Sequence, residues 1–456
     1  MSAGTRPVPA AVRPYQFPEV HHATLPNGLR LVVAPMHRLP IVTALALVDV
    51  GAASDPADRD GLVALTARTL DEGTGALDGA ELTARFEGMG TAFEAGADWD
   101  STLARVTVTP ARLDAAFALF ADVLRAPSFP DEDVDRKREE RLEDLAQQVA
   151  EPRGLADMRF TSALYGGARY GSPAGGSPRS VGGLGATDVR ACHARHYGPA
   201  TTTLILVGDI SVDVALRLAE ARFGDWRTEA TEGVTRAATP SVERQRTVVV
   251  AKADAPQSEL RIGHVGLPRR HPDHLAVVVM NAILGGLFSS RINLNLRERH
   301  AFTYGASSGF DWRRGAGPFV VSTAVKTDVT DRAVQEILRE IDAMRAAPPT
   351  GDELSLAVDY LAGVFPLRFE STSAVAGAIA GAVVHALPED WFRSYRDRVR
   401  AVSAADVHRV AQAHLDPARL LVLAVGDAAA IEAPLAALAH GTMQVVPATH
   451  DFAEPQ

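Results

Sequence analysis

The chain has 456 residues, of which 46% are hydrophobic and 22% charged, and its 46 basic and 56 acidic side chains give a formal net charge of −10. This apolar content is enough to build the buried cores of two to four domains, and it excludes collagen-like and mostly disordered chains. An acidic balance without a long basic block also argues against nucleic acid as the main partner.

Residues 1–20 are predicted to form an extended arm. They contain four prolines and no apolar run that could serve as the core of a signal peptide. The weakly polar stretches at 41–50 and 374–387 are shorter than the roughly 20 residues that a membrane-spanning helix needs. We therefore expect a soluble, cytoplasmic protein without a membrane span.

Runs of strands and helices follow the arm in chain order. Apolar patterns typical of strands occur at 29–34, 41–50, 103–109, 204–207, 247–251 and 319–325. Patterns with helical spacing occur at 61–70, 79–89, 113–124, 131–149, 274–284, 333–344 and 352–364. Strands followed by several helices favour an α+β fold over a doubly wound parallel sheet.

An internal repeat divides the chain into two halves. Residues 186–209 align without a gap on residues 404–427, at a constant offset of 218, and both copies predict a helix, a proline-marked turn and an apolar strand. Because solenoid repeats have periods of roughly 20 to 50 residues, this spacing indicates duplication of a whole domain. We expect one domain at 21–227, a polar linker at 228–246 and a second domain at 247–456, each with a mixed or antiparallel sheet packed with helices.

Five segments, spread over almost the whole chain, carry a family pattern: LPNGLRLVV from residue 25, VGAASDPADRDGLVALTARTLDEGT from residue 50, DRKREERLEDL from residue 135, DVRACHARHYGPATTTLILVGDI from residue 188 and LGGLFSSRINLNLRERHAFTYGASSG from residue 284. In this order and with this spacing they resemble the M16 (pitrilysin-like, inverzincin) peptidases, in particular their short two-domain M16B class. The resemblance implies the M16 fold of two homologous halves.

The resemblance also locates the metal motif of the family, in which H-x-x-E-H supplies two zinc ligands and a general base. Its positions are filled here by Ala64, Ala67 and Arg68, and the position of the third ligand, a Glu about 75 residues further on, is filled by Asp144. An arginine in place of a neutral imidazole would repel a divalent metal by on the order of 8 kcal/mol. We expect no metal at these positions, and the alternative for Asp144 is a side chain on the solvated face of a highly charged helix.

No other part of the sequence predicts a metal centre. Of the 14 histidines, none has another histidine four residues later. Two pairs are three residues apart, His193 with His196 and His271 with His274, and both are interpreted as surface or turn histidines. The single cysteine, Cys192, is interpreted as a buried structural thiol.

The second half retains more of the family pattern. The resemblance implies that Arg297 and Tyr304 hold the carbonyl of a bound peptide and stabilise its oxyanion, with Ser289 and Ser290 at the start of a helix beside the substrate. A guanidinium and a neutral phenol are suitable donors for this task. The structural alternative is that Tyr304 packs in a sheet and Arg297 pairs with Glu298 or another acidic neighbour.

Three details surround this pair. Gly285 and Gly286 predict a close approach of two backbones before the serines. Residues 301–303, Ala-Phe-Thr, replace the usual Gly-Leu-Ala of the family. Residues 305–309 fit the G-x-S-x-G pattern of serine hydrolases, but a hairpin is predicted at 310–326 where a nucleophile elbow would need a helix.

The function expected from the resemblance is that of the non-zinc-binding subunit of a heterodimeric M16B metallopeptidase. The chain would hold no cofactor, the zinc would be on a homologous partner subunit, and the substrate would be an extended peptide or unfolded polypeptide bound by strand addition. One alternative is a non-enzymatic peptide-binding or structural scaffold of M16 ancestry, in which Arg297 and Tyr304 are relics. Another is an independently active metalloprotease, which would need zinc on this chain.

Overall fold

A computed structural model of the protein describes residues 14–75, 77–231 and 244–448. The part of the predicted arm within this range, residues 14–20, is extended. Residues 1–13 of the arm and most of the predicted linker at 228–246 lie outside the described residues.

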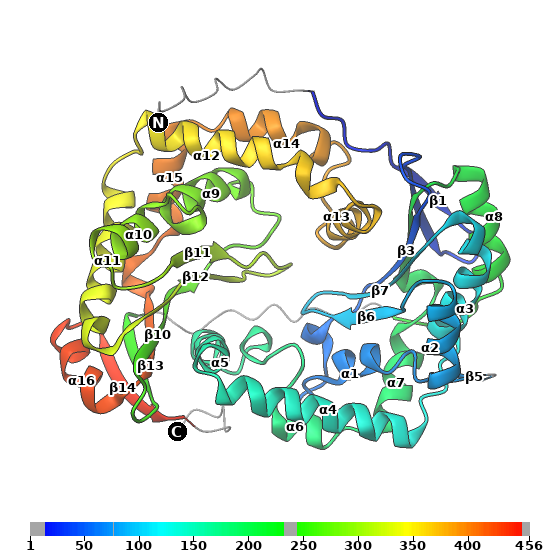
Figure 1. Ribbon diagram of the computed structural model, residues 1–456, viewed down its shortest axis with the longest axis horizontal. Coiled ribbons are helices and arrows are strands. Elements are labelled where there is room, and N and C mark those ends of the chain that lie inside the picture. The colour runs from blue at the N-terminus through cyan, green and yellow to red at the C-terminus, as the bar shows by residue number, and fades with distance from the viewer. Residues whose placement is uncertain (1–13, 76, 232–243, 449–456) are drawn as a thin grey trace, which may run out of the picture.

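Each half builds a six-stranded mixed sheet, and five of the strands follow the same order in both halves (Figure 1). The sixth strand, at one edge, comes first along the chain in the first half and last in the second. The first sheet has the order β1 (His21–Thr24), β2 (Arg30–Pro35), β8 (Thr202–Gly208), β3 (Val42–Val48), β7 (Thr102–Val108) and β6 (Glu94–Ala97). The second has the order β14 (Thr442–Pro447), β9 (Arg246–Ala251), β13 (Leu421–Gly426), β10 (Gln257–Val265), β12 (Pro318–Lys326) and β11 (Ala306–Phe310). The predicted α+β fold with two related halves is confirmed.

The repeated segments occupy equivalent places in the two halves. Helix α7 (Ala186–His196) leads into β8, and α15 (Ala404–His414) leads into β13. Strand β8 is parallel to β2 and antiparallel to β3, and β13 is parallel to β9 and antiparallel to β10. Both repeated strands therefore lie inside a sheet, which is why their apolar residues run without interruption.

The other helices surround the two sheets. In the first half they are α1 (Leu62–Arg68), α2 (Gly79–Gly88), α3 (Leu113–Arg125), α4 (Asp131–Ala150), α5 (Pro152–Tyr165), α6 (Pro178–Gly182) and α8 (Val212–Phe223). In the second half they are α9 (His274–Asn281), α10 (Arg291–Asn293), α11 (Thr330–Ala346), α12 (Gly351–Val364), α13 (Thr372–Val384), α14 (Trp391–Arg400) and α16 (Ala428–Ala437). A short two-stranded sheet joins β4 (Gly73–Thr74) and β5 (Leu77–Asp78). The helix predicted at 274–284 is α-helical only to Asn281 and continues as a π-helical segment, Ala282–Gly286.

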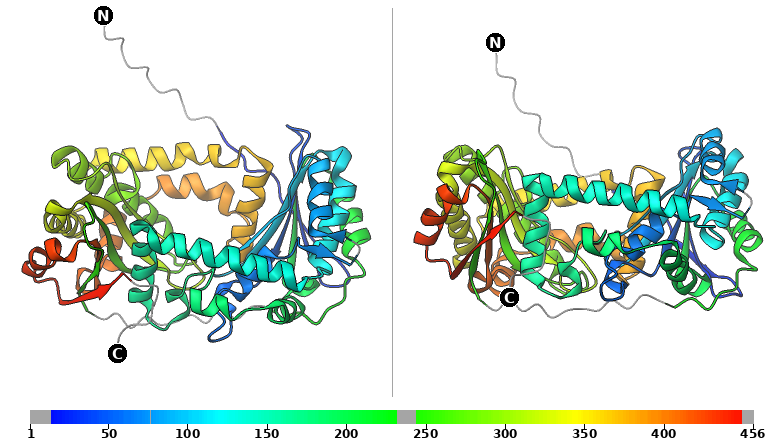
Figure 2. Two further views of the ribbon diagram at one scale, coloured as in Figure 1. Left: turned by 60° about the horizontal axis from the view of Figure 1, so that its bottom comes forward. Right: turned by 90° about the horizontal axis from the view of Figure 1, so that it is seen from below.

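The two halves exchange one helix each. Helix α5 belongs to the first half, yet Leu155 and Leu164 pack against Val250 and Leu423 of the second sheet. Helix α13 belongs to the second half, and its Ile379 packs in one cluster with β2, β3 and β8 of the first sheet. Figures 1 and 2 show α4 crossing from the first half towards the second, where α5 is delivered to that sheet. Each sheet is thus covered on one face by its own helices and on the other by a helix from the opposite half.

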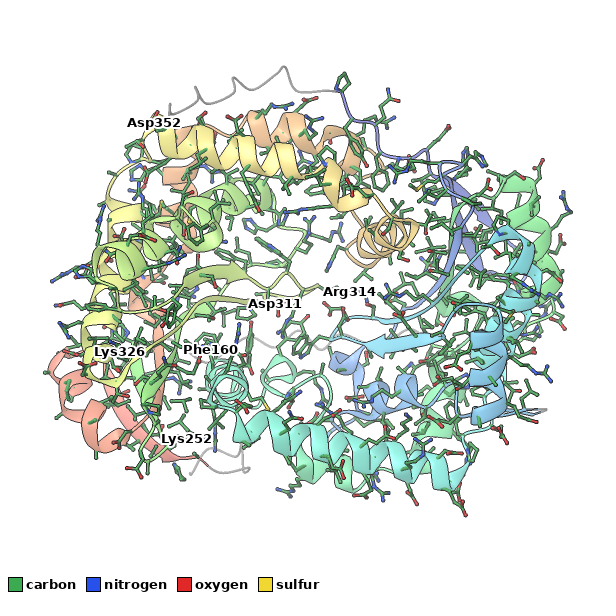
Figure 3. All side chains as sticks on the ribbon, viewed as in Figure 1. Phe160, Lys252, Asp311, Arg314, Lys326 and Asp352 are labelled. Atoms are coloured by element: carbon green, nitrogen blue, oxygen red, sulfur yellow. The ribbon has the colours of Figure 1, made fainter. Side chains whose placement is uncertain are left out.

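The turn between β11 and β12 also joins the halves (Figure 3). The Arg314 guanidinium lies 2.6 Å from an oxygen of Asp49, and the Arg314 backbone N–H donates to Asp100 Oδ2 at 2.7 Å. The Arg313 guanidinium lies over the rings of Trp99 and Tyr170, at 3.6 and 4.7 Å from their centroids. These contacts hold the tip of the second-half hairpin against the first half.

The arm adds an aromatic contact across the halves. Phe17 stacks on Phe392 at 4.1 Å between ring centroids and meets Phe369 edge-on, and Tyr15 stacks on Phe369. Because β1 follows directly, the arm links the first sheet to α14 of the second half.

One helical stretch, His274–Arg299, is long and apolar enough to cross a membrane by length and composition. This stretch was not among those expected from the sequence. Inside the protein, 61% of its apolar window is buried, as in a core helix.

Candidate functional site

The positions of the family's metal motif come together in the first half, but their side chains form an ion pair. Arg68 Nη1 lies 2.9 Å from Asp144 Oδ2. Ala64 lies beside them and Ala67 is fully buried. The expected proximity of α1 and α4 is therefore present, although neither alanine has a side chain that could bind a metal.

Helix α1 is short and is held at its start by a buried carboxylate. Asp55 accepts the backbone N–H groups of Gly61 at 2.8 Å and Val63 at 2.9 Å. Burial raises the pKa of Asp55 to about 6, against the effect of these two hydrogen bonds. This cap fixes the helix that presents Ala64 and Arg68.

A pocket of about 400 Å³ opens beside these residues. Its walls are Gly61, Ala64, Leu65, Arg68, residues 95–97, Arg141 and Gly175. Arg141 donates to the Gly175 carbonyl at 2.9 Å. Burial, together with the nearby charge of Arg68, lowers the pKa of the Arg141 guanidinium. The pocket is lined by two guanidinium groups, and the Asp144 carboxylate is paired with one of them, so these residues do not fit a divalent metal.

The pocket reaches the edge of the first sheet. Strand β6 pairs with β7 and ends the strand order, so its other edge has no partner strand among the residues that the structure describes. Residues 95–97 of that strand line the pocket. An extended peptide can add to such an edge by backbone hydrogen bonds.

Arg297 and Tyr304 lie in the second half, one before and one after a tight bend. The Arg297 guanidinium lies 4.5 Å from the ring centroid of Phe288, and its Nε lies 3.4 Å from Glu298 Oε1. Tyr304 is 95% exposed, directly before β11. The alternative that Tyr304 packs in the sheet is therefore wrong, whereas the pairing of Arg297 with Glu298 is present.

A second pocket, of about 240 Å³, adjoins Tyr304. Its lining includes Thr303, Ser307 and Ser322 from the second half and Arg153 from the first turn of α5. The exchanged helix α5 thus brings a cation from the first half to the pocket that Tyr304 lines.

The two serines differ in their surroundings. Ser289 is exposed, whereas Ser290 is buried and its hydroxyl has no hydrogen-bond partner among the described residues. Ser290 precedes α10 but does not cap it with its side chain. A role for either serine in substrate binding stays a prediction.

Two asparagines, which the sequence analysis missed, fix this region. Asn281 Nδ2 donates to the Ser308 carbonyl at 3.0 Å, and Asn293 Oδ1 accepts the Ala306 N–H at 3.0 Å. Both lie on the apolar helical stretch that precedes the bend. A polar amide within an apolar helix needs hydrogen-bond partners, so the asparagines within this apolar stretch were the sequence signal that could have indicated these contacts.

The predicted close approach at Gly285 is confirmed. A Cβ there would lie 2.4 Å from Ser308 Oγ and 2.7 Å from the Ser308 backbone nitrogen. The departure at 301–303 also has a structural consequence, because Ala301 has φ +52°, a left-handed conformation that favours glycine. The bend before Tyr304 therefore forms without the glycine that is usual in the family.

The histidines require a correction. His196 and His274 are buried rather than on the surface. His193 and His196 bond to the carbonyl oxygens of Leu124 at 3.0 Å and Thr231 at 2.9 Å. Cys192 is a buried free thiol, as expected, and burial raises its pKa to about 12.

Two family models match most of the chain. The model described as insulinase (peptidase family M16) matches residues 32–177, and the model described as peptidase M16 inactive domain matches residues 183–361.

Curated relatives match at low identity but over most of their length. An uncharacterised zinc protease of Streptomyces coelicolor is 24% identical over 79% of this chain and 79% of its own. The zinc protease PqqE of Helicobacter pylori is 21% identical over 81% of this chain and 84% of its own.

Solved structures share the fold. A peptidase M16 inactive domain from Pseudomonas fluorescens has a TM-score of 0.83 at 24% identity and covers 89% of this chain and 98% of its own. A protease from Helicobacter pylori has a TM-score of 0.85 at 19% identity, with 90% and 100% covered. A chain of complex III from Candida albicans has a TM-score of 0.76 at 16% identity, with 91% and 97% covered.

Proposed function

The chain belongs to peptidase family M16, and on that premise we propose that it is the subunit of a heterodimeric M16 metallopeptidase that lacks the family's catalytic zinc site. The observation that carries the proposal is the ion pair between Arg68 and Asp144 at the positions of the family's metal ligands. A chain with this pair needs a second subunit for the metal and the general base. We propose that a zinc-bearing homologue supplies both.

Arg297 and Tyr304 are the proposed contribution of this chain. Tyr304 is almost fully exposed, so packing in the core of this chain does not explain why a tyrosine occupies this position. Arg297 lies on the ring of Phe288, which is itself 68% exposed. Exposed aromatic and arginine side chains are typical of surfaces that bind a partner or a ligand.

The proposed substrate is an extended peptide or an unfolded polypeptide. The free edge of β6 offers backbone groups for strand addition, and the pocket of residues 95–97 lies along it. The pocket next to Tyr304 offers hydroxyl groups and the Arg153 guanidinium for a side chain or terminus of the peptide.

Kinetics of the reconstituted pair test the roles of the two residues. The purified chain is mixed with an M16 homologue that carries H-x-x-E-H, and hydrolysis of a quenched fluorescent peptide is followed. Because one well-placed oxyanion donor contributes roughly a hundredfold to a thousandfold in rate, Tyr304→Phe and Arg297→Ala should each lower kcat/KM by about that factor.

Arg299→Ala is the matched control, since Arg299 lies on the same π-helical segment, Leu294–Arg299, and has no proposed role. Its turnover should equal that of the wild type. Unchanged turnover in both Tyr304→Phe and Arg297→Ala would refute the proposed roles and favour the scaffold alternative.

A further inference from the structure

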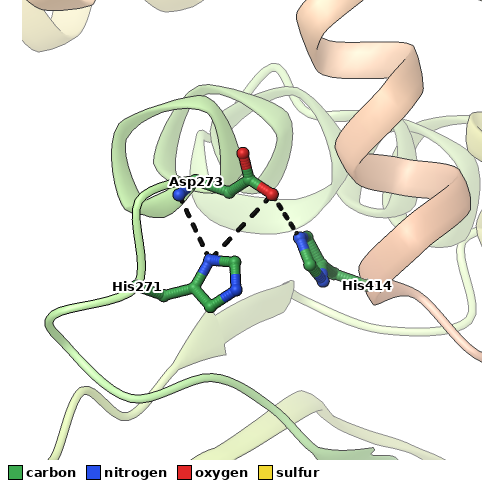
Figure 4. A group of neighbouring side chains, drawn as sticks. All are labelled: His271, Asp273 and His414. Carbon is green, nitrogen blue, oxygen red and sulfur yellow. Dashed lines mark hydrogen bonds and ion pairs between the residues drawn. The ribbon is translucent and has the colours of Figure 1, made fainter.

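Two histidines and an aspartate from distant parts of the second half meet at the end of α15 (Figure 4). His271 and Asp273 lie in the turn before α9, and His414 is the last residue of α15, 141 positions after Asp273. One ligand atom of each side chain lies within 4.8 Å of the other two. Within the described ranges, no other group of three His, Cys, Asp or Glu side chains meets this condition.

We propose that His271, Asp273 and His414 form a binding site for a divalent transition metal of the zinc type. Asp273 Oδ2 lies 2.7 Å from His414 Nε2 and 3.9 Å from His271 Nδ1. A tetrahedral ion with bonds of about 2.0–2.2 Å holds its ligand atoms roughly 3.4 Å apart. The first separation has to widen by about 0.7 Å and the second to shorten by about 0.5 Å. His271 Nδ1 also has to release the Asp273 backbone N–H, which it accepts at 3.1 Å.

The ligand types select the metal. Two imidazoles and one carboxylate suit zinc, cobalt or nickel, whereas calcium and magnesium prefer oxygen ligands alone. Three protein ligands leave one position for water. His414 now bonds to Asp273 through Nε2, so metal binding needs the tautomer of His414 that carries its proton on Nδ1.

Arg409 competes with the metal for the carboxylate. Its guanidinium lies 2.7 Å from Asp273 Oδ1 and 3.1 Å from Oδ2. The Arg409 side chain is 54% exposed, so it is free to move away from Oδ2 and keep only its bond to Oδ1. In that arrangement Arg409 orients the ligand from outside the coordination sphere.

Comparison of the two repeats shows that the first half has no equivalent of this cluster among the described residues. The counterpart of His414 at the repeat offset is His196, which bonds instead to the backbone carbonyl of Thr231. A histidine at this position therefore needs no carboxylate to be accommodated. Of the two repeat-related histidines, only His414 bonds to a carboxylate, that of Asp273. An ion bound there would connect the end of α15 to the start of α9.

Zinc titration of the metal-stripped full chain, without partner or peptide, tests the proposal. Calorimetry should show one zinc ion per chain. His271→Ala and His414→Gln should each weaken binding at least tenfold, because each removes one of three ligands. His414→Gln keeps a hydrogen-bonding group beside Asp273, so a folded variant is expected.

Two further variants sharpen the result. Arg409→Gln should tighten zinc binding, since it frees the carboxylate, and His408→Ala should leave it unchanged, because His408 lies on the same helix but bonds to the Arg345 carbonyl. Absence of zinc binding in the wild type, or binding unaffected by His271→Ala and His414→Gln, would overturn the proposal. Neither result bears on the proposed peptidase role, which does not use this site.

Discussion

At the residue scale, Arg68 decides what the first-half pocket can bind. The side chains of Arg68 and Asp144 are 36% and 47% exposed, and a pair this exposed contributes less than about 1 kcal/mol to stability. Folding stability therefore does not explain the pair. Its main effect is electrostatic, since it places a fixed cation where the family binds a metal.

Ala301 provides a stability prediction at the bend before Tyr304. Its φ of +52° costs an L-residue about 1–2 kcal/mol, and glycine avoids this cost. Glycine also loses more conformational entropy on folding than alanine, which offsets part of the gain in stability. Ala301→Gly should therefore raise the free energy of unfolding by about 0.5–1 kcal/mol, measured by urea denaturation. Ala306→Gly, in the neighbouring strand β11, should lower it, and the same sign for both variants would contradict this explanation.

Asp55 predicts a pH dependence of stability. Its pKa of about 6 in the folded chain is above the ordinary value of 3.8, so the folded state binds the proton more tightly than the unfolded state does. The stabilisation from the protonated form is complete below about pH 4 and is lost as the pH rises through about 6. Relative to Asp55→Asn, the wild type should lose on the order of 3 kcal/mol between pH 4 and pH 7. Urea denaturation at a series of pH values measures this difference, and a constant difference would show that Asp55 is not the titrating group.

At the scale of elements, the exchanged helices α5 and α13 make each sheet depend on the other half. Alternating residues of the inner strands face opposite clusters, with Leu204 and Leu206 in the cluster of the first half's own helices and Ile205 and Val207 beside α13. Without the exchanged helix, one apolar face of each sheet would be exposed to water.

Ile379 tests this dependence. It is buried on α13 against the first sheet, so Ile379→Ala should lower the free energy of unfolding by about 2–5 kcal/mol. Leu356→Ala is the control, because Leu356 lies on α12 and is 50% exposed. If calorimetry shows two separate transitions in the wild type, the halves unfold independently and the inferred dependence is wrong.

Sequence patterns predicted many of the elements but not α5 or α13, and they did not predict which elements pack together. The apolar strand at 204–207 and the helix at 131–149 follow from local periodicity and agree with β8 and α4 within a few residues. Local patterns carry no information on which sheet an amphipathic helix covers, so the destinations of α5 and α13 could not be predicted. The cluster around Asp273 was missed for the same reason, since His414 approaches it from a distant helix.

At the scale of the molecule, the two halves form one connected frame. The exchanged helices, the hairpin tip with Arg314 and the aromatic contact of Phe17 all cross between the halves. The frame places the pocket of Arg68 in the first half, whereas the pocket of Tyr304 is lined by the second half and by Arg153 of the exchanged helix α5. The family resemblance predicted both groups of residues and no metal at the first. The side-chain contacts add the ion pair of Arg68 with Asp144 and the exposure of Tyr304.

In the proposed heterodimer, this chain completes a site whose metal lies on another subunit. The most direct test is the rate of peptide hydrolysis by the chain alone, by a zinc-bearing M16 homologue alone and by their equimolar mixture. The account predicts no hydrolysis by this chain alone and a rate for the mixture well above the sum of the two separate rates. Hydrolysis by this chain alone, or a mixture no faster than the homologue by itself, would contradict it.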